Sequence, residues 1–170
     1  MQSEELYSGH GWRVSLDEAP LPDGRVKKAA RVSRCDTVHI LAFTSKTTVL
    51  LLKEYRPFLG GFIWMLPTGR VNKEHDLHVA AQRELQEETG YRAEKLELYA
   101  TCHHSETFGS SNHIFLAHGV TKDPLPADPD EMMEVHDLPL TEAITNVLGC
   151  TSVHAPSAYA LLRYEREMRT

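Results

Sequence analysis

The sequence predicts an α+β fold in which strands come first, one helix interrupts them, and two helices end the chain. Three observations support this prediction. Apolar runs typical of strands recur between residues 12 and 66, a helical periodicity follows Asp76, and helical patterns return at 141–148 and 156–168. Because the elements are grouped instead of alternating, a mixed α+β domain is favoured over a regular repeat of strand–helix–strand units.

The first part of the chain is expected to form five strands. They are rich in β-branched and apolar residues, and turn-forming Pro and Gly residues separate them. The expected strands span 12–16, 26–33, 37–43, 47–55 and 62–66. Within the fourth, Val49–Leu52 is apolar throughout, which is typical of a buried strand.

A helix is expected between Asp76 and Gly90. Leu77, Ala81 and Leu85 lie four residues apart and form one apolar stripe. Asp76 is suited to cap the first turn, and Gly90 is suited to end the helix because glycine tolerates positive φ.

Three further strands and two helices are expected after this helix. They are, in order, strands at 96–103, 113–120 and 132–138 and helices at 141–148 and 156–168. The polar stretch 104–112 is expected to be the loop between the first two of these strands. The Pro- and Asp-rich stretch 123–130 is expected to be a second loop.

Composition predicts a single globular domain over residues 1–170, with 41% hydrophobic and 25% charged residues. Lys and Arg number 18 and Asp and Glu number 24, so the net charge is −6. That balance argues against general binding of nucleic-acid polymers or membrane surfaces. The polar N-terminus lacks the apolar segment of a secretory signal, so a cytoplasmic protein is expected.

The three cysteines are Cys35, Cys102 and Cys150, and no Cys-x-x-Cys pair occurs. A zinc ribbon and a thioredoxin-like pair are therefore unsupported. Free thiols in a reducing compartment are expected.

Three carboxylates crowd one face of the expected helix. Glu84 and Glu88 are four residues apart, and Glu87 lies beside them. Like charges at this spacing destabilise a helix by a few tenths of a kcal/mol per pair, a cost that a divalent cation would reverse. Arg83, four residues before Glu87, can pair with it or steady the cluster. A solvated charged helix face is the alternative interpretation.

The span 69–91 resembles the Nudix box: Gly, five residues, Glu, seven residues, then Arg-Glu-aliphatic-x-Glu-Glu-x-Gly-aliphatic. The matching positions are Gly69, Arg83, Glu84, Leu85, Glu87, Glu88 and Gly90, with aromatic Tyr91 in the last place. The box's first Glu is replaced by His75. Because that Glu mainly supports the loop in Nudix proteins, we expect altered loop packing at His75 rather than lost activity or a new metal ligand.

The resemblance implies a Nudix fold, a mixed β-sheet sandwiched between helices. It also implies a Mg²⁺ site, with Mn²⁺ as a possible substitute, whose ligands are Glu84, Glu87, Glu88 and the backbone carbonyl of Thr68. The implied reaction is hydrolysis of a diphosphate linked to a nucleoside.

Residues before the box resemble the ADP-ribose and nucleotide-sugar pyrophosphatase branch of this family. The similar segments are 54–57, 60–61 and 66–69. The branch's arginine falls on Arg56, which is expected to contact the substrate diphosphate, a role that suits a guanidinium. A surface ion pair is the alternative for Arg56.

Residues 128–135 resemble the acidic segment of the same branch. Glu131, and after it Asp130, are the carboxylates expected to serve the metal ions or the attacking water. A solvated acidic loop is the alternative. Trp12 and Phe108 are candidates to stack on the base, although packing is the more common role of Trp.

The expected substrate is a nucleoside diphosphate sugar, with ADP-ribose as the first choice. A Nudix nucleoside triphosphate pyrophosphohydrolase, a non-catalytic nucleotide-sugar-binding module and an acidic docking protein remain alternatives. The branch's Ser-Pro-Gly turn is absent from 105–112, so other sugars stay open. Members of the branch are usually homodimers, which makes residues 1–35 an expected dimerisation element.

The negative charge is local. Residues 123–162 contain seven acidic residues and no Lys or Arg, which gives −7, so the rest of the chain sums to +1. This charge would repel an anionic diphosphate, which favours a metal-dependent mode of binding.

Overall fold

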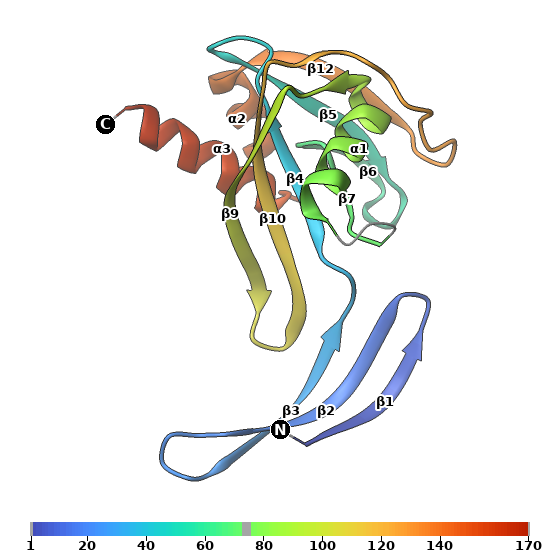
Figure 1. Ribbon diagram of the computed structural model, residues 1–170, viewed down its shortest axis with the longest axis vertical. Coiled ribbons are helices and arrows are strands. Elements are labelled where there is room, and N and C mark those ends of the chain that lie inside the picture. The colour runs from blue at the N-terminus through green and yellow to red at the C-terminus, as the bar shows by residue number, and fades with distance from the viewer. Residues whose placement is uncertain (1, 73–75, 170) are drawn as a thin grey trace.

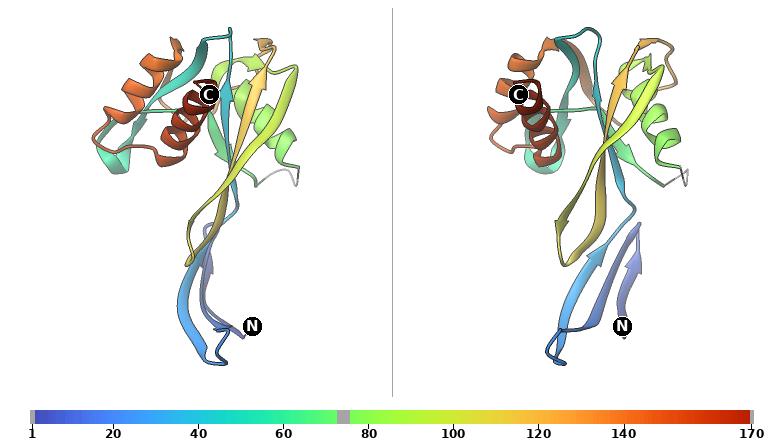
Figure 2. Two further views of the ribbon diagram at one scale, coloured as in Figure 1. Left: turned by 90° about the vertical axis from the view of Figure 1, so that its left-hand side faces the viewer. Right: turned by 60° about the vertical axis from the view of Figure 1, so that its left-hand side comes forward.

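The computed structural model describes residues 2–72 and 76–169 (Figure 1). A mixed β-sheet and a smaller antiparallel sheet lie between helix α1 (Leu77–Thr89) on one side and helices α2 (Leu140–Leu148) and α3 (Ala155–Met168) on the other (Figure 2). The predicted α+β fold, with sheets sandwiched between helices, is confirmed. Within the described ranges, no helix combines the length and the apolar character needed to cross a membrane.

The larger sheet has seven strands in the order β1-β2-β3-β10-β4-β7, with β9 also paired to β10. Its members are β1 (Ser3–Gly9), β2 (Trp12–Pro20), β3 (Val26–Ser33), β4 (Thr37–Ala42), β7 (Thr68–Arg70), β9 (Lys95–Ser105) and β10 (Phe108–His118). β10 is parallel to β3 and β4, and the other pairs are antiparallel.

The second sheet contains β5 at its centre, between β12 and β6. Its strands are β5 (Thr48–Arg56), β6 (Gly61–Met65) and β12 (Met133–Pro139), and a 3₁₀ turn, η1 (Pro57–Leu59), joins the first two. Two short strands, β8 (Tyr91–Arg92) and β11 (Thr121–Lys122), form a separate pair beyond α1.

Strand β4 lies at the centre of the core, and all six of its residues are buried. Because side chains alternate along a strand, Val38, Ile40 and Ala42 pack in the cluster that includes α1. Leu41 packs in the cluster that includes α2 and α3. Thr37 and His39 share the Leu41 face, so the same alternation turns two polar side chains toward α3.

Helix α1 begins and ends as expected. The Asp76 carboxylate accepts hydrogen bonds from the amides of His78 at 2.7 Å and Val79 at 3.3 Å. Gly90 closes the helix with φ of 73°. Ala81 and Leu85 are fully buried. The helix is therefore fixed at both ends, with its acidic face turned away from this core.

The structure differs from the sequence-based expectation around 104–112. Strands β9 and β10 continue through this stretch and leave only a tight turn at Glu106 and Thr107. Its polar residues belong to a ladder in which Ser111 pairs with His103. Strand β1 was also not expected, because its polar sequence lacks the alternation of a half-buried strand and its order comes from pairing with β2.

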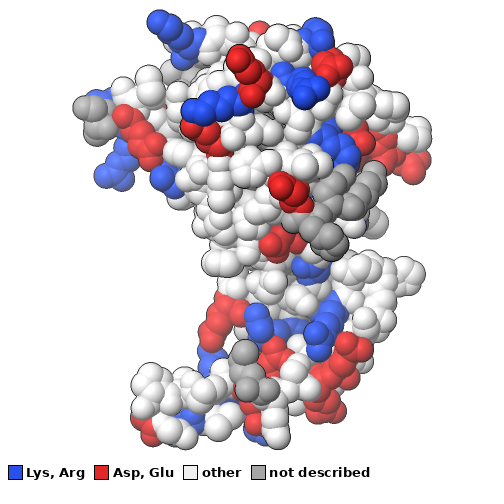
Figure 3. Space-filling model, in the orientation of Figure 1, with Lys and Arg blue, Asp and Glu red and all other residues white. Residues whose placement is uncertain are grey.

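Strands β1–β3 form an arm that extends away from the rest of the molecule (Figure 1). The arm is connected to the other strands of the larger sheet at Val32. This residue pairs with Phe108 of β10 and donates its amide to Thr107 O at 2.9 Å. On the face shown in Figure 3, acidic and basic side chains are interspersed over the arm. Leu6 and Val26 are more than half exposed on it.

All three cysteines are free, as expected. Cys150 Sγ accepts a hydrogen bond from the Trp64 amide at 3.2 Å and so satisfies a backbone group of β6. This contact gives one thiol a structural role.

Candidate active site

A cleft of about 940 Å³ opens between α1, the turn at β7 and the N-terminus of α3. Charged side chains dominate its lining. The acidic residues are Glu84, Glu87, Glu88, Asp128, Asp130 and Glu131, and the basic residues are Arg34, Arg56, Arg70 and Arg83. The fold therefore brings together the box, the expected diphosphate-binding arginine and the acidic loop.

Glu88 lies at the buried end of the acidic group. Its Oε2 accepts a 2.7 Å hydrogen bond from the Thr68 amide. Burial raises the pKa of Glu88 well above its usual range, and the neighbouring Glu84 adds to the effect. A buried carboxylate with one hydrogen bond from the protein is costly unless a cation compensates its charge.

Glu84 lies against the backbone of Gly69. A Cβ atom at position 69 would lie only 1.8 Å from the Glu84 carboxyl carbon, so the absence of a side chain at this position admits the carboxylate. Burial raises the pKa of Glu84, and Arg83 opposes this by pairing with Oε1 at 2.7 Å.

Arg83 also pairs with Glu87, one helical turn further on. The pairing predicted from the sequence is confirmed. Arg83 thus bridges Glu84 and Glu87. As the side chains are placed, no three His, Cys, Asp or Glu residues of the described ranges are grouped closely enough to hold a metal ion.

The donor set nevertheless fits a hard divalent cation. Glu84, Glu87, Glu88 and the Thr68 carbonyl supply only oxygen, which Mg²⁺ prefers. Gly69 leaves space for the Glu84 carboxylate, and the buried Glu88 accepts a hydrogen bond from the Thr68 amide. An ion entering here would replace Arg83 as the positive partner of Glu84 and Glu87. The metal roles of these residues remain predictions.

Arg56, at the end of β5, reaches the cleft from the second sheet. Its Nη2 lies 2.8 Å from Glu54 Oε2 and 3.3 Å from Met65 Sδ. Arg56 therefore forms an ion pair and also lines the cleft, and its contact with a diphosphate remains a prediction. Burial raises the pKa of Glu54, and Arg56 opposes the shift.

The acidic loop places Asp128, Asp130 and Glu131 at the cleft wall. Burial raises the pKa of Glu131, and the nearby Asp128 adds to the effect. Glu131 therefore lines the cleft while belonging to an exposed acidic loop. Its catalytic role remains a prediction.

Trp12 and Phe108 lie together although 96 residues separate them, with ring centroids 5.9 Å apart. Phe108 also contacts the ring of His104 at 4.8 Å, and the Arg34 guanidinium lies 5.3 Å from the Trp12 ring. His104 and Arg34 line the cleft, so the aromatic pair lies next to it.

Several cleft residues were missed in the sequence. Arg34 follows β3 directly, and Arg70 enters the same cleft because β7 pairs with β4 opposite Thr37, a pairing with no local signature in the sequence. The buried Arg34 Nε has no hydrogen-bond partner among the described residues, and burial lowers the pKa of this guanidinium.

His39 and His154 also line the cleft. A histidine inside the apolar run of β4 was a usable signal. His75 lies outside the described residues.

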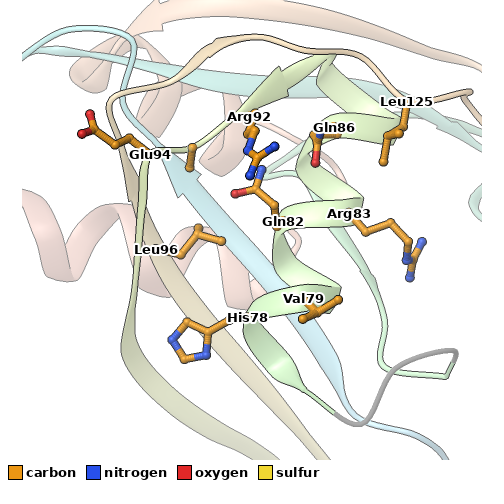
Figure 4. Close-up of a pocket in the computed structure, with 10 residues that line it drawn as sticks. His78, Val79, Gln82, Arg83, Gln86, Arg92, Glu94, Leu96 and Leu125 are labelled. Atoms are coloured by element: carbon orange, nitrogen blue, oxygen red, sulfur yellow. The ribbon is translucent and has the colours of Figure 1, made fainter.

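A second cavity, of about 460 Å³, lies on another face of α1. His78, Gln82 and Leu96 line it, and Figure 4 shows Arg83 directed away from these three side chains. It contains none of the clustered carboxylates, and of the residues that line it Arg83 also lines the candidate active site.

Comparisons with known proteins identify the family of this chain. Residues 33–157 match the NUDIX domain family model. The chain is 31% identical over 161 residues to an ADP-ribose pyrophosphatase of Bacillus subtilis, covering 93% of this chain and 87% of that protein. It is also 31% identical over 147 residues to a methanol dehydrogenase activator of Bacillus methanolicus, covering 85% and 80%.

A mouse ADP-sugar pyrophosphatase is 30% identical over 166 residues, covering 85% of this chain and 75% of that protein. The fold is also similar to the crystal structure of an ADP compounds hydrolase, with a TM-score of 0.78, 19% identity and coverage of 99% and 94%. The chain therefore belongs to the NUDIX domain family and is a hydrolase of its ADP-ribose and nucleotide-sugar pyrophosphatase branch.

Proposed function

We propose that this protein hydrolyses the diphosphate bond of a nucleoside diphosphate sugar, with ADP-ribose as the first substrate, in a Mg²⁺-dependent reaction. The products are a nucleoside monophosphate and a sugar phosphate. One observation carries the proposal: a single cleft contains the buried box carboxylates Glu84 and Glu88 together with Arg56. An acidic site accepts a diphosphate only with added positive charge, which a divalent cation and an arginine supply.

The substrate would lie across the cleft. Mg²⁺ bound at Glu84, Glu87, Glu88 and the Thr68 carbonyl would neutralise phosphate oxygens and orient the attacking water. Arg56 can hold phosphate oxygens in a bidentate manner. Trp12 and Phe108 lie where a base could stack beside the cleft.

Glu131 and Arg83 have different roles in this proposal. Glu131 is the carboxylate that takes a proton from the attacking water, because it lines the cleft and its pKa is raised by burial and by Asp128. Arg83 releases Glu84 and Glu87 to the metal and remains beside them as a balancing charge. In this proposal, the residues that bind the substrate and the residues that take part in hydrolysis lie on different walls of the same cleft.

The active form is proposed to be a homodimer of single-domain chains, residues 1–170, that acts in the cytoplasm. The arm formed by β1–β3 is the proposed dimer contact. Ser15 is the only buried residue among the described residues of these three strands. A three-stranded sheet with so little burial needs a packing partner, and a second copy of the chain would provide one.

The test is a substrate panel in which the products are identified by ³¹P NMR. ADP-ribose, other nucleoside diphosphate sugars and nucleoside triphosphates are each incubated with Mg²⁺, with Mn²⁺ and with EDTA. We expect adenosine monophosphate and ribose phosphate from ADP-ribose, and no turnover in EDTA. Release of pyrophosphate from triphosphates with ADP-ribose intact would favour the triphosphate alternative. Binding of ADP-ribose without turnover would favour the non-catalytic alternative.

A further inference from the structure

The floor of the cleft contains a polar network to which the proposed reaction assigns no role. Its centre is His39, which is 2% exposed and is flanked in β4 by apolar residues on both sides. His39 lies directly opposite Thr68, because β4 and β7 are antiparallel neighbours in that register. A buried histidine therefore faces the residue whose carbonyl is the predicted metal ligand.

Both nitrogens of the His39 ring face polar side chains. Its Nδ1 lies 2.8 Å from Thr68 Oγ1, and its Nε2 lies 3.0 Å from Asn112 Oδ1. The Thr37 hydroxyl donates to Asn112 Oδ1 at 2.8 Å, and Asn112 Nδ2 lies 3.1 Å from His104 Nε2. The ring cannot turn without breaking a buried hydrogen bond, so its position is well defined.

Thr68 connects the His39 ring to the acidic cluster. Its hydroxyl donates its one proton to Val38 O at 2.8 Å and therefore accepts from the N–H at His39 Nδ1. Its amide donates to Glu88 at 2.7 Å. A shift of Thr68 would therefore displace the predicted carbonyl ligand and the Glu88 carboxylate together.

The same turn is also tied to α3. The Ser157 hydroxyl accepts a hydrogen bond from the Leu66 amide at 2.9 Å and lies 2.7 Å from His154 Nδ1. The His154 ring lies 5.3 Å from that of His39. Leu66 and Thr68 are thus fixed from α3 and from β4, which leaves the turn little freedom of its own.

We propose that His39 is a positioning residue: it holds Thr68 so that the Thr68 carbonyl and the Glu88 carboxylate stay arranged for a divalent cation. The inference rests on the proposed metal site. Loss of a side chain that orients a metal ligand typically weakens metal binding by about 10- to 100-fold. Substrate contacts that do not involve the ion should change much less.

The test is isothermal titration of Mn²⁺ into the full-length protein without substrate. His39→Leu keeps apolar volume but cannot hydrogen-bond to Thr68. His39→Asn keeps a polar atom near the position of Nδ1. Thr37→Val is the matched control: its hydroxyl contacts His39 Nε2 at 3.2 Å and Asn112, and its removal leaves the contact between His39 Nδ1 and Thr68 in place. Circular dichroism establishes that each variant is folded.

We expect His39→Leu to bind Mn²⁺ at least about tenfold more weakly, His39→Asn to recover most of the loss, and Thr37→Val to match the wild type. Equal Mn²⁺ affinity in the wild type and His39→Leu would overturn the positioning role while leaving the proposed function intact. Equal losses in all three variants would mean that the network is only structural, and would overturn it too. Absence of Mn²⁺ binding by the wild type would instead overturn the metal site of the proposed function.

If His39→Leu does not fold, Thr68→Val and Thr68→Ser carry the same comparison from the other side of the bond. The serine variant keeps the hydroxyl and should bind Mn²⁺ more tightly than the valine variant. A second readout is the metal dependence of turnover. Excess Mg²⁺ should restore kcat in His39→Leu, with KM for ADP-ribose unchanged. A KM that stays raised at saturating Mg²⁺ would contradict the inference.

Discussion

The backbone amide of Thr68 donates a 2.7 Å hydrogen bond to Glu88 Oε2, 20 residues further along the chain. The next residue, Gly69, packs against the Glu84 carboxylate. Two consecutive residues of β7 therefore position two carboxylates of α1. The acidic cluster is held by backbone atoms, so small changes in this turn should affect the site strongly.

Gly69→Ala tests that conclusion. The added Cβ would lie 1.8 Å from the Glu84 carboxyl carbon, so the carboxylate must move. Because a displacement of this size at a reacting centre is costly, we expect kcat for ADP-ribose to fall at least about tenfold. Gly61→Ala is the matched control, because a Cβ there has no neighbour within 4 Å. Equal activity of the two variants would show that the contact is unimportant.

Arg56→Ala should raise KM for ADP-ribose by about 10- to 100-fold, the usual range for losing a hydrogen bond to a charged group. Arg56→Lys should recover only part of this loss, because an ammonium cannot bind phosphate in a bidentate manner. The variant also leaves Glu54 without its 2.8 Å partner. The double variant Glu54→Gln/Arg56→Ala separates the two effects, and a normal KM in the double variant would argue against a contact between Arg56 and the diphosphate.

His154 makes stability depend on pH. Burial lowers the pKa of His154 to about 3, and His39 adds to the effect. Below the unfolded pKa of about 6.5, the unfolded chain takes up a proton that folded His154 does not. Stability from this residue is therefore complete above pH 6.5 and decreases as the pH falls. Glu84 and Glu88, whose pKa values are raised, act in the opposite direction.

Urea unfolding at pH 7.5, 6.0 and 5.0 isolates this contribution when the wild type is compared with His154→Gln. We expect the stability of the wild type to fall relative to that of the variant as the pH decreases. Any constant offset reflects the lost contact with Ser157 and not titration. Parallel pH dependences would contradict a neutral His154.

The exposed arm gives a prediction for assembly. Light scattering should give twice the chain mass of 19.2 kDa. Leu6→Lys combined with Val26→Lys places charges at two exposed apolar positions of the arm and should lower that mass. Val153→Lys is a control at an exposed apolar position outside the arm. A monomeric wild type would contradict the proposed dimer.

Local patterns were sufficient for much of the fold. The cap at Asp76, the stop at Gly90 and the apolar strands of the core depend on neighbouring residues, so the sequence predicted them. Strand β1 and the extensions through 104–112 depend on pairing with distant strands. Polar residues in these segments form backbone hydrogen bonds with a neighbouring strand, and the local pattern of polar and apolar residues does not predict this pairing.

The candidate site divides in the same way. Glu84, Glu87, Glu88 and Arg83 lie on one helix, so their spacing placed them together. The contact between Trp12 and Phe108 depends on how the chain brings distant strands together. From the sequence, the two residues could be named only as separate candidates. Arg34 and His154 enter the cleft through tertiary structure alone. His39 was visible as a histidine in an apolar strand, although its contact with Thr68 was not.

The central claim is that Glu88 acts at a metal-dependent hydrolytic site. The most direct measurement is the turnover of ADP-ribose by Glu88→Gln in Mg²⁺, beside the control Glu142→Gln on the exposed face of α2. The account predicts that Glu88→Gln stays folded and that its kcat falls at least about 100-fold, as expected when an important electrostatic group is removed, while the control matches the wild type. Turnover by Glu88→Gln equal to that of the wild type would contradict the account.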